Sequence, residues 1–429
     1  MKKINIVTLG CSKNTVDSEV LAGHLTQSGY EIFFDSDQNS DYVIINTCGF
    51  INDAKEESID MILRFAEARK NGEIQRLSVM GCLSERYKKD LIHEIPEVDN
   101  WYGVNDIDAI VRDLDIDWRK QLVGERVLST PKHYSYLKIA EGCDRRCSFC
   151  AIPMIRGKHI SRSMDEILSE ARHLSSIGVK ELLLISQDLT YYGKDLIEKN
   201  TLAELVDKMA TQNPQTWIRL HYTFPLGFTD ELIAVFNAHD NVVKYVDIPL
   251  QHISSRILKS MHRGIDSDGT KALMRKIRKA IPNASIRTSL IVGYPGETEQ
   301  EFNELLEFVK EFKFERMGVF IYSHEEDTSA YLLEDDVPAE EKDRRRDALM
   351  DLQQGISFQH NQSLIGKTMK VLIDREEGDY WIGRTEFDSP EVDNEVLIAA
   401  EGSEQLEGSF ATVCITRADD YDLYADIVS

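Results

Sequence analysis

The chain has 429 residues, of which 42% are hydrophobic, and its 74 Asp and Glu outnumber 50 Lys and Arg, giving a formal net charge of −24. This composition can build more than one buried core, which excludes global disorder, and no apolar window is long enough for a membrane span. The negative charge argues against broad non-specific contact with nucleic acid, since phosphate binding needs Lys and Arg. The apolar run at the N-terminus is too short for a signal peptide, so we read it as the first strand of a cytoplasmic protein.

Residues 1–125 are predicted to form a small parallel α/β domain. Three short β-branched runs are each followed by a cysteine: Ile4–Leu9 by Cys11, Tyr42–Asn46 by Cys48, and Leu77–Met80 by Cys82. Helical periodicity between the runs predicts crossover helices, as in βαβ units. Because parallel strands end at one edge of a sheet, we expect the three cysteines to meet there. They would hold zinc or an iron–sulfur cluster with one metal position open, or they are cysteines buried by chance.

A polar stretch from Trp118 to Pro131 predicts a linker, and residues 126–360 repeat the strand–helix alternation. We predict strands at Tyr136–Ala140, Leu182–Ser186, Trp217–His221, Tyr245–Ile248, Ser285–Val292 and Arg316–Ile321. Capping boxes beginning at Ser163 and Thr298 mark two of the intervening helices. Six such units predict a partial (βα)6 barrel of the TIM type, with function at the carboxyl ends of its strands.

The sharpest motif is a cysteine triplet, Cys143, Cys147 and Cys150, within eight residues after the first of these strands. Three thiolates on one loop, with no fourth cysteine nearby, suit a four-iron cluster that leaves one iron free for a ligand. Phe149 would shield the cluster and offer an apolar face to an adenine ring. The alternative is a structural metal knuckle.

Other candidate residues follow the strands of the same domain. A glycine-rich turn before the second capping box would let a ligand approach the backbone, unless it is an ordinary strand–helix turn. Its candidates for cofactor binding are Ile291, Gly293, Pro295 and Gly296. Gln187 and Asp188 would bind a ribose or an amino group, or cap a loop. His252 is either a proton-transfer group or a hydrogen-bonded structural histidine.

A charged helix is predicted from Pro338 to about residue 365, and residues 361–429 then show five short strands that predict a small antiparallel β-barrel. This last segment carries 16 Asp and Glu against 5 Lys and Arg, a net charge of −11. We read its Cys414 as part of an apolar core.

These motifs together resemble the radical S-adenosylmethionine (SAM) methylthiotransferases over nearly the whole chain. The C-x3-C-x-aromatic-C triplet is similar to the radical SAM signature, and Gly10–Asn14 (GCSKN), Asn46–Ile51 (NTCGFI) and Met80–Leu83 (MGCL) are similar to the family's other cysteine motifs. Ile152–Arg162 matches the segment after the triplet. The resemblance implies a methylthiotransferase domain, a radical SAM core and a terminal TRAM domain.

The resemblance also implies the chemistry. Cys143, Cys147 and Cys150 would hold a [4Fe–4S] cluster that binds SAM and cleaves it to a 5′-deoxyadenosyl radical. Cys11, Cys48 and Cys82 would hold a second [4Fe–4S] cluster carrying the sulfur species that a second SAM methylates. The protein's part is positioning and exclusion of water. An electron donor such as flavodoxin or ferredoxin is implied, and the sulfur donor stays unknown.

Two branches of this family differ in substrate. GCSKN, Asp247–His252 (DIPLQH) and Ser389–Asp393 (SPEVD) resemble the branch that modifies the β-carbon of an aspartate in ribosomal protein S12, free or within the small subunit. The branch that modifies adenosine in tRNA usually has GCQMN. An acidic terminal domain suits a basic protein better than RNA phosphate. The sequence therefore predicts an S12 methylthiotransferase, with a tRNA enzyme and a non-enzymatic zinc-bearing binding protein as alternatives.

Overall fold

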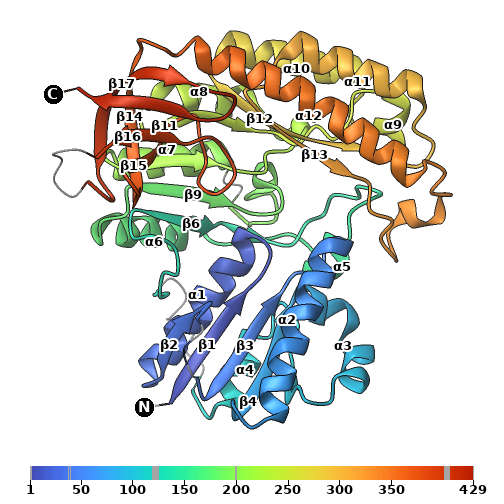
Figure 1. The fold of residues 1–429 in the computed structure, drawn as a ribbon, viewed down its shortest axis with the longest axis vertical. Coiled ribbons are helices and arrows are strands. Elements are labelled where there is room, and N and C mark those ends of the chain that lie inside the picture. The colour runs from blue at the N-terminus through green and yellow to red at the C-terminus, as the bar shows by residue number, and fades with distance from the viewer. Residues whose placement is uncertain are drawn as a thin grey trace.

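The computed structural model describes residues 2–36, 38, 40–117, 125–198, 201–400 and 406–428. Part of the predicted linker, residues 118–124, lies outside these described residues. The N-terminal domain, shown in blue in Figure 1, lies on one side of a central open sheet, and the C-terminal barrel, shown in red, packs against the same central unit. Within the described residues, no helix is long and apolar enough to cross a membrane.

The N-terminal domain is built on a parallel sheet in the order β2-β1-β3-β4-β5. Its strands are β1 (Lys3–Thr8), β2 (Glu31–Phe34), β3 (Tyr42–Thr47), β4 (Arg76–Gly81) and β5 (Asn100–Trp101). Its helices are α1 (Ser12–Gln27), α2 (Asn52–Lys70), α3 (Cys82–Glu94) and α4 (Ile107–Asp113). The three predicted strands are found within one or two residues, and the edge strands β2 and β5 were not predicted.

The central domain is an open, all-parallel sheet in the order β13-β12-β11-β10-β9-β6, and it contains the six predicted strands with small shifts of their bounds. Its strands are β6 (Tyr134–Lys138), β9 (Glu181–Ile185), β10 (Trp217–Leu220), β11 (Val242–Asp247), β12 (Ser285–Val292) and β13 (Arg316–Ile321). A short ribbon pairs β7 (Ala140–Glu141) with β8 (Ile160–Ser161).

Helices follow the strands of this sheet and bury its main apolar core. They are α5 (Ile152–Arg156), α6 (Met164–Ser176), α7 (Leu202–Gln212), α8 (Asp230–Ala238), α9 (Ser255–Ser260), α10 (Ser267–Ala280), α11 (Glu299–Phe312) and α12 (Ala339–Gln362). Both predicted start signals are found. Thr298 and Glu301 form a complete capping box, and the Ser163 side chain accepts from the amide of Glu166. Helix α12 is the predicted connection to the last domain.

The C-terminal domain is a closed barrel in the order β14-β15-β16-β18-β17. Its strands are β14 (Thr368–Glu377), β15 (Tyr380–Thr385), β16 (Val396–Ala399), β17 (Phe410–Ala418) and β18 (Leu423–Ile427). The antiparallel prediction needs one correction, because β16 and β18 run parallel where the barrel closes. Cys414 is half-buried and lies between the inward-facing Val413 and Ile415. The prediction that Cys414 belongs to the apolar core is therefore wrong.

The loop between β15 and β16 docks into the central sheet near the amino ends of its strands. Tyr134 Oη donates to Glu391 Oε1 at 2.9 Å, Tyr245 Oη donates to Asp393 Oδ2 at 2.6 Å, and Arg316 Nε donates to Asp388 Oδ1 at 2.9 Å. Carboxylates of the loop are therefore used to join two domains. The carboxyl ends of the central strands lie at the opposite edge of this sheet, and the loop with Cys143, Cys147 and Cys150 belongs to that edge.

Candidate functional site

The three N-terminal cysteines follow adjacent parallel strands and meet at one sheet edge. Cys11 is the N-cap of α1 after β1, Cys48 follows β3, and Cys82 is the first residue of α3 after β4. Gly10 has a φ of +93°, and a Cβ on it would lie 2.7 Å from Cys48 Cβ. Only glycine therefore allows the Cys11 loop to approach Cys48 this closely.

Burial and charge repulsion disfavour the thiolate forms of Cys48 and Cys82. Burial raises the pKa of Cys48, and it raises the pKa of Cys82 to about 12. Cys11 raises both pKa values further by charge repulsion, whereas the Arg156 guanidinium lowers them. Because metal ligands are thiolates, filling this site would release protons, and a positive centre would relieve the repulsion.

The second set of cysteines lies on a loop after the ribbon strand β7, and the loop is anchored at several points. The Cys143 amide donates to Gly157 O at 3.1 Å, and Ser148 Oγ lies 2.8 Å from Tyr294 Oη. Gly142 has a φ of +76°, and a Cβ on it would collide with Lys158 O at 2.1 Å. The tight turn before Cys143 thus requires glycine.

An arginine lies against this second set. Arg263 is buried, and its guanidinium donates to Cys147 Sγ at 3.3 Å and to Pro249 O at 2.6 Å. Burial raises the pKa of Cys143 to about 11 and that of Cys150 to about 12. Three soft sulfurs on one loop are a donor set that fits an iron–sulfur cluster.

The two cysteine sets lie on elements that pack together at the domain boundary. Cys82 packs in one apolar cluster with Val104, Ala151 and Ile155, and Ala151 is the residue after Cys150. The carboxyl edges of two different sheets therefore meet at this boundary. A reaction that uses both sets needs this arrangement.

A buried polar network fixes that boundary, and sequence reasoning missed it. Arg156 at the end of α5 donates to Asn14 Oδ1 at 2.5 Å, to Asp17 Oδ2 at 3.1 Å and to Glu141 Oε2 at 3.0 Å. Its guanidinium also lies 3.7 Å from Cys82 Sγ. Lys138 pairs with the same carboxylates of Asp17 and Glu141. The polar and charged residues between Gly10 and Asp17 were the one sequence feature that could have indicated this network.

Gln187 and Asp188 lie at the carboxyl end of β9, as predicted, and both make contacts within the chain. Gln187 Nε2 donates to Glu141 Oε1 at 2.7 Å, while its Oε1 and the neighbouring Ser186 Oγ are buried with no partner among the described residues. Asp188 accepts from Arg145 Nε at 2.8 Å and from the Thr190 amide at 2.9 Å. The unpartnered Gln187 and Ser186 oxygens suit polar groups of a ligand, whereas Asp188 caps its loop.

Phe149, the predicted adenine-facing residue, packs in one apolar cluster with Ile291, a predicted cofactor-binding residue. Pro295 is buried in the following turn. The amide of Gly293 donates to Glu297, and that of Gly296 donates to Asp336 Oδ1 at 2.6 Å. Carboxylates of the chain itself therefore already occupy these two amides.

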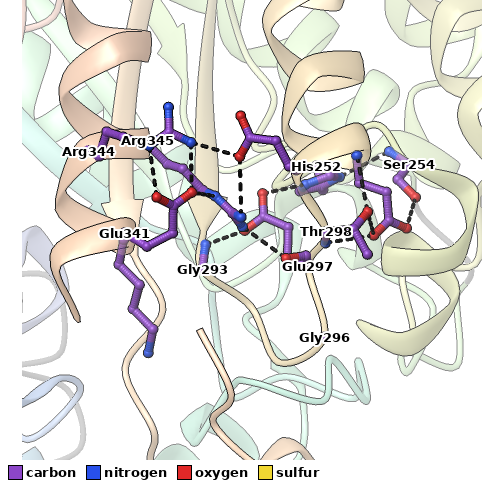
Figure 2. Close-up of polar contacts among 12 residues, drawn as sticks. His252, Ser254, Gly293, Gly296, Glu297, Thr298, Glu341, Arg344 and Arg345 are labelled. Atoms are coloured by element: carbon purple, nitrogen blue, oxygen red, sulfur yellow. Dashed lines mark hydrogen bonds and ion pairs between the residues drawn. The ribbon is translucent and has the colours of Figure 1, made fainter. Parts of the chain in front are cut away.

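Figure 2 shows the network that holds this turn. His252 Nδ1 accepts from the Ser254 amide at 2.9 Å, so its other nitrogen, Nε2, faces Glu297 Oε1 at 3.2 Å as a donor. Arg345 of α12 pairs with the same Glu297 carboxylate at 3.1 Å. His252 is fully buried and engaged on both nitrogens, which describes a structural histidine rather than a proton-transfer group.

Among the described residues, no group of three or more His, Cys, Asp or Glu side chains is arranged to hold a metal ion. Donors of one tetrahedral ion stand within about 4 Å of each other, given Zn–S bonds of about 2.3 Å. The ligands of an iron–sulfur cluster bind different irons and stand farther apart.

Three family models match the chain. Residues 3–103 match "Uncharacterized protein family UPF0004", residues 137–309 match the radical SAM superfamily, and residues 365–428 match the TRAM domain. The matches follow the chain in the order of the three observed domains.

Curated relatives match over the full length. The chain is 53% identical to "Ribosomal protein uS12 methylthiotransferase RimO" of Bacteroides thetaiotaomicron, covering 100% of this chain and 99% of the relative. It is 51% identical to the protein of the same name from Cytophaga hutchinsonii, covering 99% and 98%. Among solved structures, the radical SAM methyltransferase TsrM from Kitasatospora setae matches with a TM-score of 0.53 at 12% identity, covering 75% of each chain, which shows a shared fold.

Proposed function

Since this chain belongs to the ribosomal protein uS12 methylthiotransferase family, we propose that it adds a methylthio group to the β-carbon of an aspartate in ribosomal protein S12 by radical SAM chemistry. The observation that carries this proposal is identity of 53% to a uS12 methylthiotransferase along the whole chain, with both cysteine sets present on elements that pack together at the domain boundary. The 12% identical structures support the fold of this assignment and not its substrate.

We assign the two cysteine sets to two [4Fe–4S] clusters. Cys143, Cys147 and Cys150 hold the cluster that binds SAM, and the other set, at the edge of the N-terminal sheet, holds the cluster that carries sulfur. When bound, the clusters and SAM supply the electron, the radical, the sulfur and the methyl group. Soft thiolate donors, three to a set, support this assignment.

The chain itself orients and shields the reactants. Arg156 fixes the N-terminal sheet edge against the central domain through contacts to Asn14, Asp17 and Glu141. Phe149 and Ile291 supply the apolar surface for the adenine, and the free Gln187 and Ser186 oxygens supply acceptors for its ribose or amino group. The carboxylate network around Glu297 keeps the turn after β12 in place.

The basic S12 protein is met by an acidic surface. In the described part of residues 361–429, seven carboxylate residues are exposed: Glu376, Glu377, Asp379, Glu391, Glu407, Asp419 and Asp426. Opposite charge raises the rate of encounter and favours a basic partner over RNA. A one-electron donor such as flavodoxin or ferredoxin completes the proposal.

Anaerobic reconstitution of the full chain with iron and sulfide tests the function. We expect a brown protein that, with SAM and a reductant, places a methylthio group on an S12 peptide, as detected by mass spectrometry. A methylthio product on tRNA alone would contradict the assignment to S12. A colourless protein that binds only zinc would support the non-enzymatic alternative.

A further inference from the structure

Lys13 is a buried cation at the domain boundary, and no carboxylate of the described residues pairs with it. It lies on the first turn of α1, two residues after Cys11, and is 7% exposed. Its ammonium lies 3.1 Å from the centre of the Tyr222 ring. In the part of the chain that the structure describes, Lys13 makes no side-chain hydrogen bond and no ion pair.

Three cations near Lys13 or Tyr222 are paired with carboxylates. Lys138 is paired with Asp17 and Glu141, Arg156 with the same two carboxylates, and Arg287 with Asp247. Burying an ammonium without a counter-charge is costly, and an aromatic face compensates only in part. Lys13 therefore stands out as a cation prepared for an anion from outside the chain.

The Tyr222 ring is held in place by a strained backbone. Tyr222 follows β10 at the carboxyl edge of the central sheet and has a φ of +59°, which is rare for a bulky side chain. Its amide donates to Asp247 Oδ2 at 2.8 Å, which holds the turn. Strain of this kind persists where the surroundings enforce it, and it commonly occurs at functional sites.

A second unsatisfied polar group lies beside Lys13. Ser12 Oγ is buried with no hydrogen-bond partner among the described residues. It lies on the same first helical turn, where the helix dipole favours a negative charge. A hydroxyl donor, an ammonium and a helix N-terminus suit one ligand chemistry, a carboxylate.

We propose that Lys13 binds the side-chain carboxylate of the aspartate that is modified, and that it selects aspartate over uncharged residues at that position. This inference rests on the proposed function. Lys13 lies two residues after Cys11 of the first set and against Tyr222, which follows a strand of the central sheet at its carboxyl edge. Binding through the carboxylate leaves the adjacent β-carbon free for the transfer.

The test is a double-mutant cycle on the reconstituted full chain, with SAM present and reductant absent so that no turnover occurs. A fluorescent S12 peptide carries either Asp or Asn at the target position, and its Kd is measured by anisotropy. For the unmodified enzyme we expect the Asn peptide to bind about tenfold more weakly or worse, as for loss of a charge-assisted hydrogen bond. Lys13→Met should bind the two peptides equally, and Lys13→Arg should restore the preference.

Lys55→Met is the matched control, because Lys55 lies in the same domain and is already paired with Glu325 at 3.0 Å. It should keep the preference for Asp. Iron content and visible absorbance confirm that each variant is folded and loaded. Preference for the Asp peptide that persists in Lys13→Met overturns the inference.

The carboxylate of SAM is the other anion available, and its Kd is measured in parallel. A loss of SAM affinity in Lys13→Met with the peptide preference intact assigns Lys13 to the cofactor and also overturns the inference. Failure of the proposed function is distinguishable, because the unmodified enzyme would then bind neither peptide and would modify tRNA.

Discussion

The junction between the central sheet and the C-terminal barrel depends on one buried arginine, Arg384. Its Nη1 donates to Glu181 Oε2 at 2.7 Å and its Nε donates to Asp374 Oδ2 at 2.6 Å, while the residue is only 2% exposed. Arg219 Nε donates to the other oxygen of Glu181 at 2.6 Å. The change Arg384→Met removes the charge and keeps most of the volume.

The expected loss of unfolding free energy in Arg384→Met depends on which carboxylates keep another partner. Removing one partner of a buried ion pair typically costs about 3–5 kcal/mol, because the other charge is left in an apolar surrounding. Glu181 would keep Arg219, and Asp374 would keep His133 at 2.8 Å, so we expect the lower end, about 3 kcal/mol. That is a large share of the roughly 5–15 kcal/mol that stabilises a typical protein.

Urea unfolding of the reconstituted protein measures this cost. Trp381 lies in the core of the C-terminal barrel and Trp217 contacts Phe410 at the junction, so tryptophan fluorescence reports on both sides. We expect Arg384→Met to lower the urea concentration at the midpoint of the first unfolding transition. Each transition is analysed by itself, because a multi-domain chain need not unfold in one step.

Arg375→Met is the matched control for this prediction. Arg375 belongs to the same barrel and also contacts two carboxylates, Glu377 at 2.8 Å and Glu395 at 2.7 Å, but its side chain is 45% exposed. Exposed pairs are worth about 0–1 kcal/mol, so its midpoint should hardly move. Equal shifts for the two variants would refute the reasoning that burial decides the cost.

Three further predictions concern the cysteines and one carboxylate. Cys147→Ala should abolish reductive SAM cleavage, measured as 5′-deoxyadenosine. Normal cleavage would show that Cys147 is not a required ligand of the cluster that binds SAM. Cys48→Ala should stop sulfur insertion and reduce bound iron from about eight to about four atoms per chain, and unchanged iron would contradict the second cluster. Burial alone would raise the pKa of Glu301, but hydrogen bonds from Arg256 and the Thr298 amide lower it to about 2. Its stabilising contribution is therefore complete above the unfolded pKa of about 4.3 and is lost as pH falls toward 2. The difference in unfolding free energy between the unmodified chain and Glu301→Gln should shrink across that range, and a constant difference would be evidence against the shift.

Local patterns predicted the parts of the site that lie close together in sequence. The edge at which Cys11, Cys48 and Cys82 meet follows from three strand–cysteine repeats, because parallel strands end on one side. Strands Ser285–Val292 and Arg316–Ile321 begin and end where predicted. Short edge strands such as β5, with two residues, carry too little periodicity to be recognised.

Contacts between distant segments could not be predicted from periodicity. Arg156 reaches Asp17 across 139 positions, and Arg384 reaches Glu181 across 203. Such pairs depend on how whole domains dock, which no local spacing encodes. The glycine-rich turn at Gly293 shows the reverse case. Its residue types suggested a backbone that a ligand could approach, but the Gly293 amide already donates to Glu297, four residues later.

The acidic charge of the C-terminal domain does not by itself explain how one residue of the substrate is selected. Part of the net charge of −11 in residues 361–429 is turned inward, since Asp374, Asp388 and Asp393 bind cations of the central sheet or the barrel itself. The exposed carboxylates that remain can attract a basic protein, but attraction at long range does not choose one residue of it. Choosing an acidic side chain on a basic partner needs a positive group in the site. In this acidic chain, Lys13 is a buried cation that has no counter-charge among the described residues and lies beside the cysteines.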